Sequence, residues 1–158
     1  MRKYTTLTRF AAVAALFVST ALPTTVAAQE AVELEGDVKV VRMVGEEGAQ
    51  REEMQEPTSV VPGDRLMFAT NYRNGSSDVM EDFVITNPLP GAVMLAKSGD
   101  FSVSLDGETY GALSDLTVDN GDGTSRPAEL ADVTHIQWTL ARLEPGASGS
   151  VTYFAVVR

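Results

Sequence analysis

The sequence contains no cysteine and a single histidine, His135, among its 158 residues. Without cysteine the chain forms no disulfide and has no N-terminal lipid attachment, and one histidine gives poor support for a zinc or iron site. A Ser-His-acid triad would need His135. This residue falls within a predicted strand, on the face expected to meet solvent, and no Gly-x-Ser-x-Gly motif occurs. We therefore predict no catalytic residue, no cofactor, no metal ligand and no enzymatic activity.

Basic residues are scarce, with 12 Lys and Arg against 22 Asp and Glu, and three of the basic residues lie within the first 28 positions. The remaining chain has nine basic and 22 acidic residues, a formal charge of −13. Nucleic acids and anionic lipid surfaces attract basic patches, so this balance argues against both as partners. Strong net charge of one sign mainly keeps a protein soluble.

No apolar run approaches the length of about 20 residues that a membrane-spanning helix needs. The longest is the alanine-rich stretch 10–22, and small residues follow it at 26–28. Three basic residues precede it: Arg2, Lys3 and Arg9. This order of basic, apolar and small segments is typical of a secretory signal peptide. We predict a signal peptide over 1–28, cleaved between Ala28 and Gln29, and an exported protein, periplasmic or secreted to the cell surface of a bacterium, with no membrane insertion after cleavage. An uncleaved anchor is the alternative.

Helical periodicity is also missing, because no stretch of a dozen residues after position 28 repeats its apolar residues at helical spacing. Short runs with period-two alternation occur instead, clearest at 65–72, 134–140 and 150–157. In the second run we place Ile136, Trp138 and Leu140 inside. Shorter strands are predicted at 83–86, 92–96 and 101–105, with a polar surface loop over 119–132. Strands at this spacing, separated by Gly and Pro turns, predict an all-β fold: an immunoglobulin-like β-sandwich of roughly seven to nine antiparallel strands over 62–158.

Residues 29–61 are expected to form a polar lead-in followed by a β-hairpin packed on that domain. Its strands are predicted at 38–44 and 51–61, around a turn at 45–50; a flexible loop over 45–57 is the alternative. Acidic residues cluster at the tip and form the candidate interaction surface: Glu46, Glu47, Glu52, Glu53 and Glu56. A solvated acidic surface is the simpler interpretation of the same cluster.

The last strand, 150–157, is apolar on both faces near its end, as a central strand is. We predict that it is core. If it lay at a sheet edge, its unpaired backbone could accept another strand.

Three weaker patterns have ordinary structural explanations. The segment 119–123 (DNGDG) suggests a calcium loop, but glycines occupy two of the alternating ligand positions, so a Gly-rich turn is favoured. Residues 104–107 resemble part of a sialidase-type aspartate box, yet a hairpin turn explains them better. A Lys–Asn bond between first and last strands, using Lys39 or Lys97, is disfavoured, because the last strand lacks Asn and Asp and an acid such as Glu144 is the only candidate near it.

Four motifs resemble the bacterial conserved-repeat family of immunoglobulin-like surface domains, also called domain of unknown function eleven. They are PGD at 62–64, NYRNG at 71–75, VITNPLPG at 84–91 and WTLARLEPGASGSVTYFAVV at 138–157. Asn87 departs from the family, which often has Asp there, and 38–61 lie outside its pattern. The resemblance implies a sandwich exposed at the envelope or secreted, with no catalytic residues to carry over.

Together these observations predict a non-enzymatic exported envelope protein, a structural or protein-interaction module whose partner is an envelope or surface protein. One alternative is a subunit of a surface polymer assembled by strand exchange. Another is a carbohydrate-binding module, although aromatic residues make up only 7% of the chain and most alternate inward.

Overall fold

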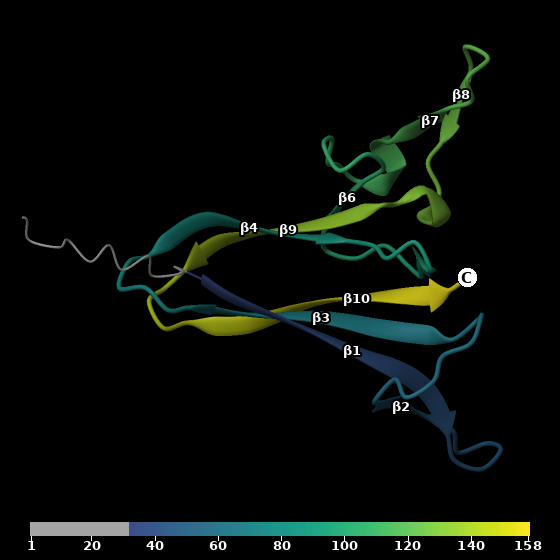
Figure 1. The fold of residues 1–158 in the computed structure, drawn as a ribbon, viewed down its shortest axis with the longest axis horizontal. Helices are drawn as coiled ribbons and strands as arrows, with labels where there is room; N and C mark the ends of the chain where they lie inside the picture. The colour runs from purple at the N-terminus through teal and green to yellow at the C-terminus, as the bar shows by residue number, and fades with distance from the viewer. Residues whose placement is uncertain (1–31) are drawn as a thin grey trace, which may run out of the picture.

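Two antiparallel sheets form the protein in the computed structural model, which describes residues 32–158. The first sheet has the order β2-β1-β3-β10-β5 and the second the order β4-β9-β6. The strands of the first are β1 (Val32–Val44), β2 (Arg51–Gln55), β3 (Arg65–Asn74), β5 (Val93–Leu95) and β10 (Ser148–Val157). Those of the second are β4 (Met80–Pro88), β6 (Ser102–Ser104) and β9 (His135–Leu143). The two sheets lie one above the other (Figure 1).

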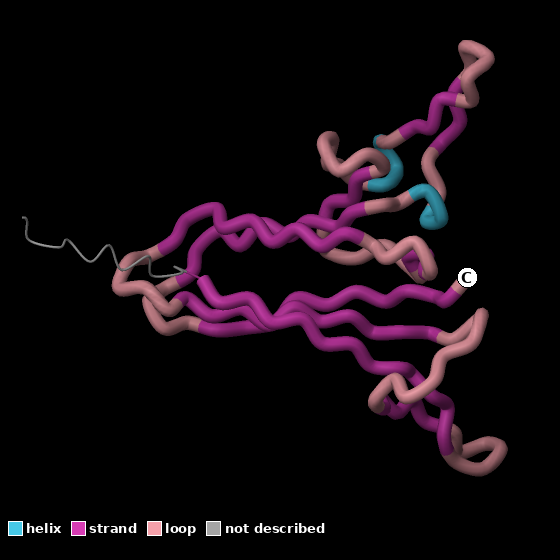
Figure 2. The backbone as a smooth tube through the Cα atoms, viewed as in Figure 1, coloured by secondary structure: helices cyan, strands magenta, loops and turns pink. Residues whose placement is uncertain are grey.

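A smaller unit projects from the second sheet between β6 and β9 (Figures 1 and 2). It contains the strand pair β7 (Thr117–Asp119) and β8 (Ser125–Pro127) and two single-turn 3₁₀ helices, η1 (Leu113–Asp115) and η2 (Leu130–Asp132). The two main sheets contain eight strands, so the prediction of an all-β sandwich of roughly seven to nine strands is confirmed. The predicted signal peptide 1–28 and its cleavage site at Ala28 and Gln29 lie outside the described residues.

The core forms where alternating side chains of the two sheets meet. Ile136 is fully buried and Trp138 is 8% exposed, as their alternation predicts. The Trp138 ring meets Phe101 edge-on, with centroids 5.5 Å apart, and Tyr153 stacks on Phe68 at 4.9 Å. A third pair, Trp138 with Tyr153 at 6.2 Å, joins β9 of the second sheet to β10 of the first through the core.

Strand boundaries differ from the prediction at the N-terminal hairpin. β1 begins at Val32 because it pairs with β3 along the whole of β3, from Val32 opposite Asn74 to Val41 opposite Arg65. β2 ends at Gln55, so the predicted strand over 51–61 is wrong beyond that residue. The chain at 56–61 leaves the sheet and is held by Asp64, whose carboxylate accepts the Val61 N–H at 2.9 Å and pairs with Arg42.

The predicted loop over 119–132 is also more ordered than expected, since it contains β8 and η2. Arg126 of β8 donates two hydrogen bonds of 2.7 Å to the carboxylate of Asp132 in η2. This contact lowers the pKa of Asp132 to about 2. This ion pair holds β8 against η2, the single turn that precedes β9.

Asn74 joins the two sheets at the end where β3 turns into β4. Its side chain is completely buried, and its Nδ2 donates to the carbonyls of Asp78 and Leu143, at 2.8 and 3.1 Å. Its Oδ1 accepts from the N–H and the hydroxyl of Ser76. Because Leu143 ends β9, one amide side chain fixes the turn and links the first sheet to the second.

Candidate interaction site

The predicted acidic surface at the hairpin tip is only partly free of internal contacts. Glu52 forms a two-bond ion pair with Arg65, at 2.7 and 3.1 Å. Glu53 lies 3.4 Å from Arg51, and Glu56 pairs with Lys39, whose pKa is raised mainly by that hydrogen bond. Glu46 and Glu47 are exposed in the turn between β1 and β2 and form no ion pair within residues 32–158.

The structure thus separates the five predicted residues into two groups. Three are engaged by basic side chains: Glu52 by Arg65 of β3, Glu53 by Arg51 of its own strand, and Glu56 by Lys39 of β1. Two remain available to an external partner, but they lie on an exposed turn without a formed pocket. A pair of acids in a turn defines no specific site, so the tip by itself carries little functional information.

The last strand, β10, was predicted to be core, and its apolar second half is core. Tyr153 and Ala155 are buried, and residues 155–157 lie between β3 and β5. The pairing with β5 stops there, however, and the Ala96 N–H bonds to the Phe154 carbonyl as the last contact on that side. The first half of β10 therefore has only one strand neighbour, β3, within the described residues.

His135 is half-buried rather than fully exposed. The turn after β6 packs on its ring, so closely that a Cβ at Gly107 would lie 2.9 Å from the imidazole. Its Nδ1 lies 2.9 Å from the hydroxyl of Thr134. His135 therefore supports the packing of a turn, and this contact was not visible from sequence because the turn lies 28 residues earlier.

The acidic loops considered as ligand sites use their carboxylates to form turns. Asp106 accepts the N–H groups of Glu108 and Thr109, at 2.8 and 2.9 Å, and these bonds lower its pKa to about 2. Asp119 accepts the N–H of Gly121 and Asp122 that of Thr124. Within residues 32–158 no group of three His, Asp or Glu side chains is arranged to hold a metal ion.

The lysine crosslink that the sequence disfavours has no geometric support either. Lys39 contacts Asp37 and Glu56, whereas Glu144 pairs with Arg142 at 2.6 Å. Lys97 lies over the Phe154 ring, 5.0 Å from its centroid. Each of the three candidate side chains is engaged elsewhere.

The feature that sequence reasoning missed is an unpaired strand edge on β1. β2 pairs with β1 only from Val40 to Val44, so residues 32–39 have β3 on one side and no strand on the other within the described chain. The Val38 N–H is satisfied by the Asp37 carboxylate at 2.9 Å. Among residues 32–158, no such acceptor contacts the outward N–H groups of the edge from Val32 to Gly36.

The direction of the backbone groups along this edge follows from the antiparallel ladder. Asn74 donates its N–H to Ala147, and Val157 donates its N–H to Asp64, so even-numbered β3 residues bond to β10. Odd-numbered β3 residues then bond to odd-numbered β1 residues. The backbone groups of residues 32, 34 and 36 consequently point away from the sheet.

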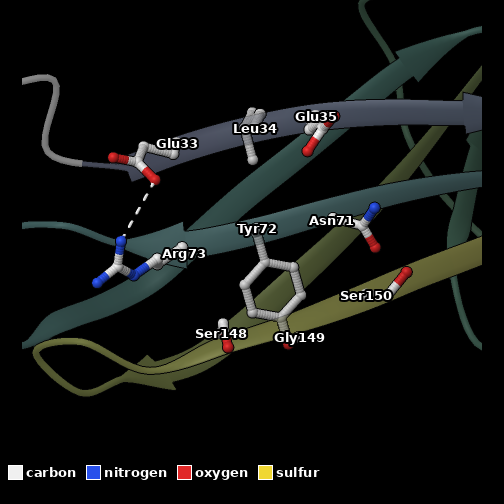
Figure 3. A pocket seen from close by; sticks show the side chains of 9 residues that line it. All are labelled: Glu33, Leu34, Glu35, Asn71, Tyr72, Arg73, Ser148, Gly149 and Ser150. Atoms are coloured by element: carbon white, nitrogen blue, oxygen red, sulfur yellow. Dashed lines mark ion pairs between the residues drawn. The ribbon is translucent and has the colours of Figure 1, made fainter.

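The two faces beside this edge differ in character. A shallow hollow of about 520 Å³ lies across β1, β3 and β10 beside the edge, with Leu34, Tyr72 and Gly149 among its lining residues (Figure 3). Six side chains form two rows across β1, β3 and β10 around it: Glu33, Arg73 and Ser148, and Glu35, Asn71 and Ser150. Figure 3 also shows the Glu33–Arg73 ion pair, 3.8 Å long, with both side chains largely exposed.

On the inner face, β1 extends beyond the cover of the second sheet. That sheet has three strands and ends at β4, whereas the first sheet continues past β3 to β1 and β2. Leu34 is therefore 52% exposed although its neighbours on β3 face the core. A largely apolar hollow of about 370 Å³ opens beside Gly36, lined also by Val38, Phe68 and Pro90.

The fold and the site together define an antiparallel β-sandwich in which β1 of the first sheet has a long unpaired edge. In comparisons with known proteins, no family model, no curated protein and no solved structure matches the chain. The resemblance to the conserved-repeat family thus stays a prediction. No helix within residues 32–158 is long and apolar enough to cross a membrane.

Proposed function

We propose that the chain is a non-enzymatic exported envelope protein that acts as a protein-interaction module, and that its partner is another envelope or surface protein. The observation that carries this proposal is the open side of the sandwich, where the β1 edge is unpaired and the second sheet ends early. An uncovered strand edge is a recognised binding surface for extended protein segments. The sequence signature of a signal peptide supports export.

The alternatives have weaker support. In strand exchange, a donated N-terminal strand fills a gap in a neighbouring subunit, but here β1 already pairs with its own β3 along the whole of β3. Glycan binding uses exposed aromatic rings, whereas Trp138 and Tyr153 are buried in the core. The proposal therefore favours a partner protein over a polymer or a sugar.

In-cell crosslinking of the tagged full-length protein tests the function. We expect a single discrete shifted band on a denaturing gel of the envelope or medium fraction, and mass spectrometry of the unshifted form should give a chain that begins at Gln29. A ladder of regularly increasing mass would instead support a polymer. An uncrosslinked monomer alone would count against a dedicated partner.

A further inference from the structure

We propose that the unpaired edge of β1, residues 32–38, accepts an extended segment of the partner as an added strand, and that this segment alternates basic with apolar side chains. The inference rests on the proposed function, because it names the chemistry of the partner that the module binds. It follows from three independent properties of the edge: its free backbone groups, its charge and its uncovered inner face.

The backbone of this edge offers hydrogen bonds to one strand. Residues 32, 34 and 36 direct their N–H and C=O groups away from β3, as the ladder geometry requires. The Val38 N–H already donates to the Asp37 carboxylate, so the run of free N–H groups ends at Gly36. An added segment would be aligned by main-chain bonds, which supply affinity without regard to sequence.

The outer-face side chains along the edge then select the sequence by charge. Glu33, Glu35 and Asp37 alternate on this face of β1, opposite β3 residues of the same face. Glu33 and Glu35 are exposed; Arg73 lies 3.8 Å from Glu33, and Lys39 lies 3.6 Å from Asp37. Opposite charges on directly facing strands stabilise pairing and like charges oppose it. A Lys or Arg at alternate positions of the added segment complements this row.

The inner-face positions select apolar residues. Leu34 is half-exposed, and nothing lies within 4 Å of the place where a Cβ on Gly36 would stand. The adjoining hollow is lined mainly by apolar atoms of Val38, Phe68 and Pro90. Side chains that alternate with the basic ones would cover Leu34 and enter this hollow, which removes apolar surface from water.

A second copy of the chain does not fit the same edge. Antiparallel pairing of two β1 edges must align residues 32, 34 and 36 with one another, because these carry the free backbone groups. Pairing residue 32 with residue 36 places Glu33 opposite Glu35, and pairing residue 34 with residue 36 places Glu33 opposite Asp37 and Glu35 opposite Glu35. The acids that attract a basic segment therefore repel a second β1.

Two other open edges in the described chain, those of β10 and β4, lack this combination. In the first half of β10, the backbone groups of Ser148, Ser150 and Thr152 point towards the free side, and none of these residues is charged. The outer edge of β4 is interrupted at Asp82, which has a positive φ of 50° and no partner in β9, and ends at Pro88. Proline and irregular backbone discourage strand addition.

The direct test is an NMR titration of the processed, exported protein with seven-residue peptides. The peptides alternate Lys with Val or Glu with Val. We expect the Lys peptide to shift the amides of Leu34 and Gly36, slow their exchange, and bind at least about tenfold more tightly than the Glu peptide. Equal affinities, or shifts confined to another surface, would overturn the inference.

Three variants sharpen the test. Leu34→Pro removes an outward N–H and should abolish binding of the Lys peptide, whereas Ser150→Pro, the matched change on the open edge of β10, should leave it intact. Because Leu34→Pro could disturb folding, the exposed pair Glu33→Lys and Glu35→Lys provides a second measurement. This double variant should reverse the preference towards the Glu peptide, and an unchanged preference would contradict the charge argument.

The same variants separate this inference from the proposed function. If the crosslinked band in cells disappears with Leu34→Pro and persists with Ser150→Pro, the partner binds at the β1 edge. A band that persists in both variants keeps the function and rejects the edge. If the unaltered protein gives no band, the proposed function fails, and the peptide titration still decides whether the edge accepts basic strands.

Discussion

At the scale of single residues, the amide of Asn74 is the polar group on which the arrangement of the two sheets depends most. It is fully buried, and its side chain makes four hydrogen bonds to the turn at 76–78 and the end of β9. A buried polar group that loses its partners costs more than an exposed one, because water cannot replace them.

We expect Asn74→Ala to lower the free energy of unfolding by about 3 kcal/mol, since it leaves the buried Leu143 carbonyl without its Asn74 donor and removes the bonds that fix the turn. Asn71→Ala, on the same strand but exposed, is the matched control and should change stability by no more than about 0.5 kcal/mol. Urea denaturation of both variants measures the difference. Equal stability of the two variants would show that Asn74 does not link the sheets.

Tyr153 provides a prediction for alkaline pH. Burial raises the pKa of its hydroxyl to about 12, from an ordinary value of 10.0. The folded state thus favours the neutral form, and the resulting stability is complete below pH 10 and is lost as pH rises towards 12. We expect a loss of about 2 kcal/mol across this range. Tyr153→Phe should lack this part of the pH dependence in chemical denaturation measured at pH 9 and pH 12.

Residue positions could be predicted from sequence where they depend on local alternation. Ile136 and Trp138 are buried as expected because period two alone assigns them to one face. The half-burial of His135 was not predictable, since Gly107 reaches it from a distant turn. The importance of Asn74 was hidden in the same way, because a polar residue in a turn motif has no local sign of burial.

At the scale of elements, the hairpin strand β2 has the least support from the rest of the fold. It is five residues long, lies at the end of its sheet, and contacts the body through β1 and the ion pair of Glu52 with Arg65. Short edge strands with few buried side chains open locally at low cost.

We expect backbone amides in β2 to exchange with solvent at least about tenfold faster than those in β3, which has a strand on each side. Hydrogen exchange monitored by mass spectrometry measures this ratio, and β4, another edge strand but one that packs on the core, is the comparison. Protection of β2 equal to that of β3 would mean that the hairpin is an integral part of the cooperative unit.

The hairpin also shows which parts of a strand can be predicted from sequence and which cannot. The turn at 45–50 and the strand at 38–44 follow from local composition, and both are present. The extension of β1 back to Val32 follows from pairing with β3, about 40 residues later at Asn74, and no local pattern reports that pairing. The open edge was invisible for the same reason, because it depends on how far β2 pairs along β1, and the exposure of its inner face depends on how many strands the opposite sheet contains.

At the scale of the whole molecule, the acidic row on β1 bears on association with itself. The edge is long enough to template another β1, but Glu33, Glu35 and Asp37 place like charges opposite each other in such a pair. Net charge far from zero also opposes self-association.

We expect the processed protein to be monomeric in sedimentation velocity up to millimolar concentration in low salt. The double change Glu33→Thr and Glu35→Thr keeps β-propensity and removes the repulsion, so it should produce a dimer at high concentration. Glu46→Thr with Glu47→Thr removes the same charge from the hairpin turn and should stay monomeric. A dimer of the unaltered protein through β1 would refute this account of the edge.

The positions of β1 and β10 on either side of β3 have a mechanical consequence. Both strands run antiparallel to β3, so they run parallel to each other, and Val32 and Arg158 lie at opposite ends of the sandwich (Figure 1). Tension applied between these two residues pulls β1 and β10 in opposite directions along β3. The two ladders are then loaded in shear, with all their hydrogen bonds resisting at once, rather than unzipped bond by bond. A chain of this topology can transmit force along its length without first losing its core.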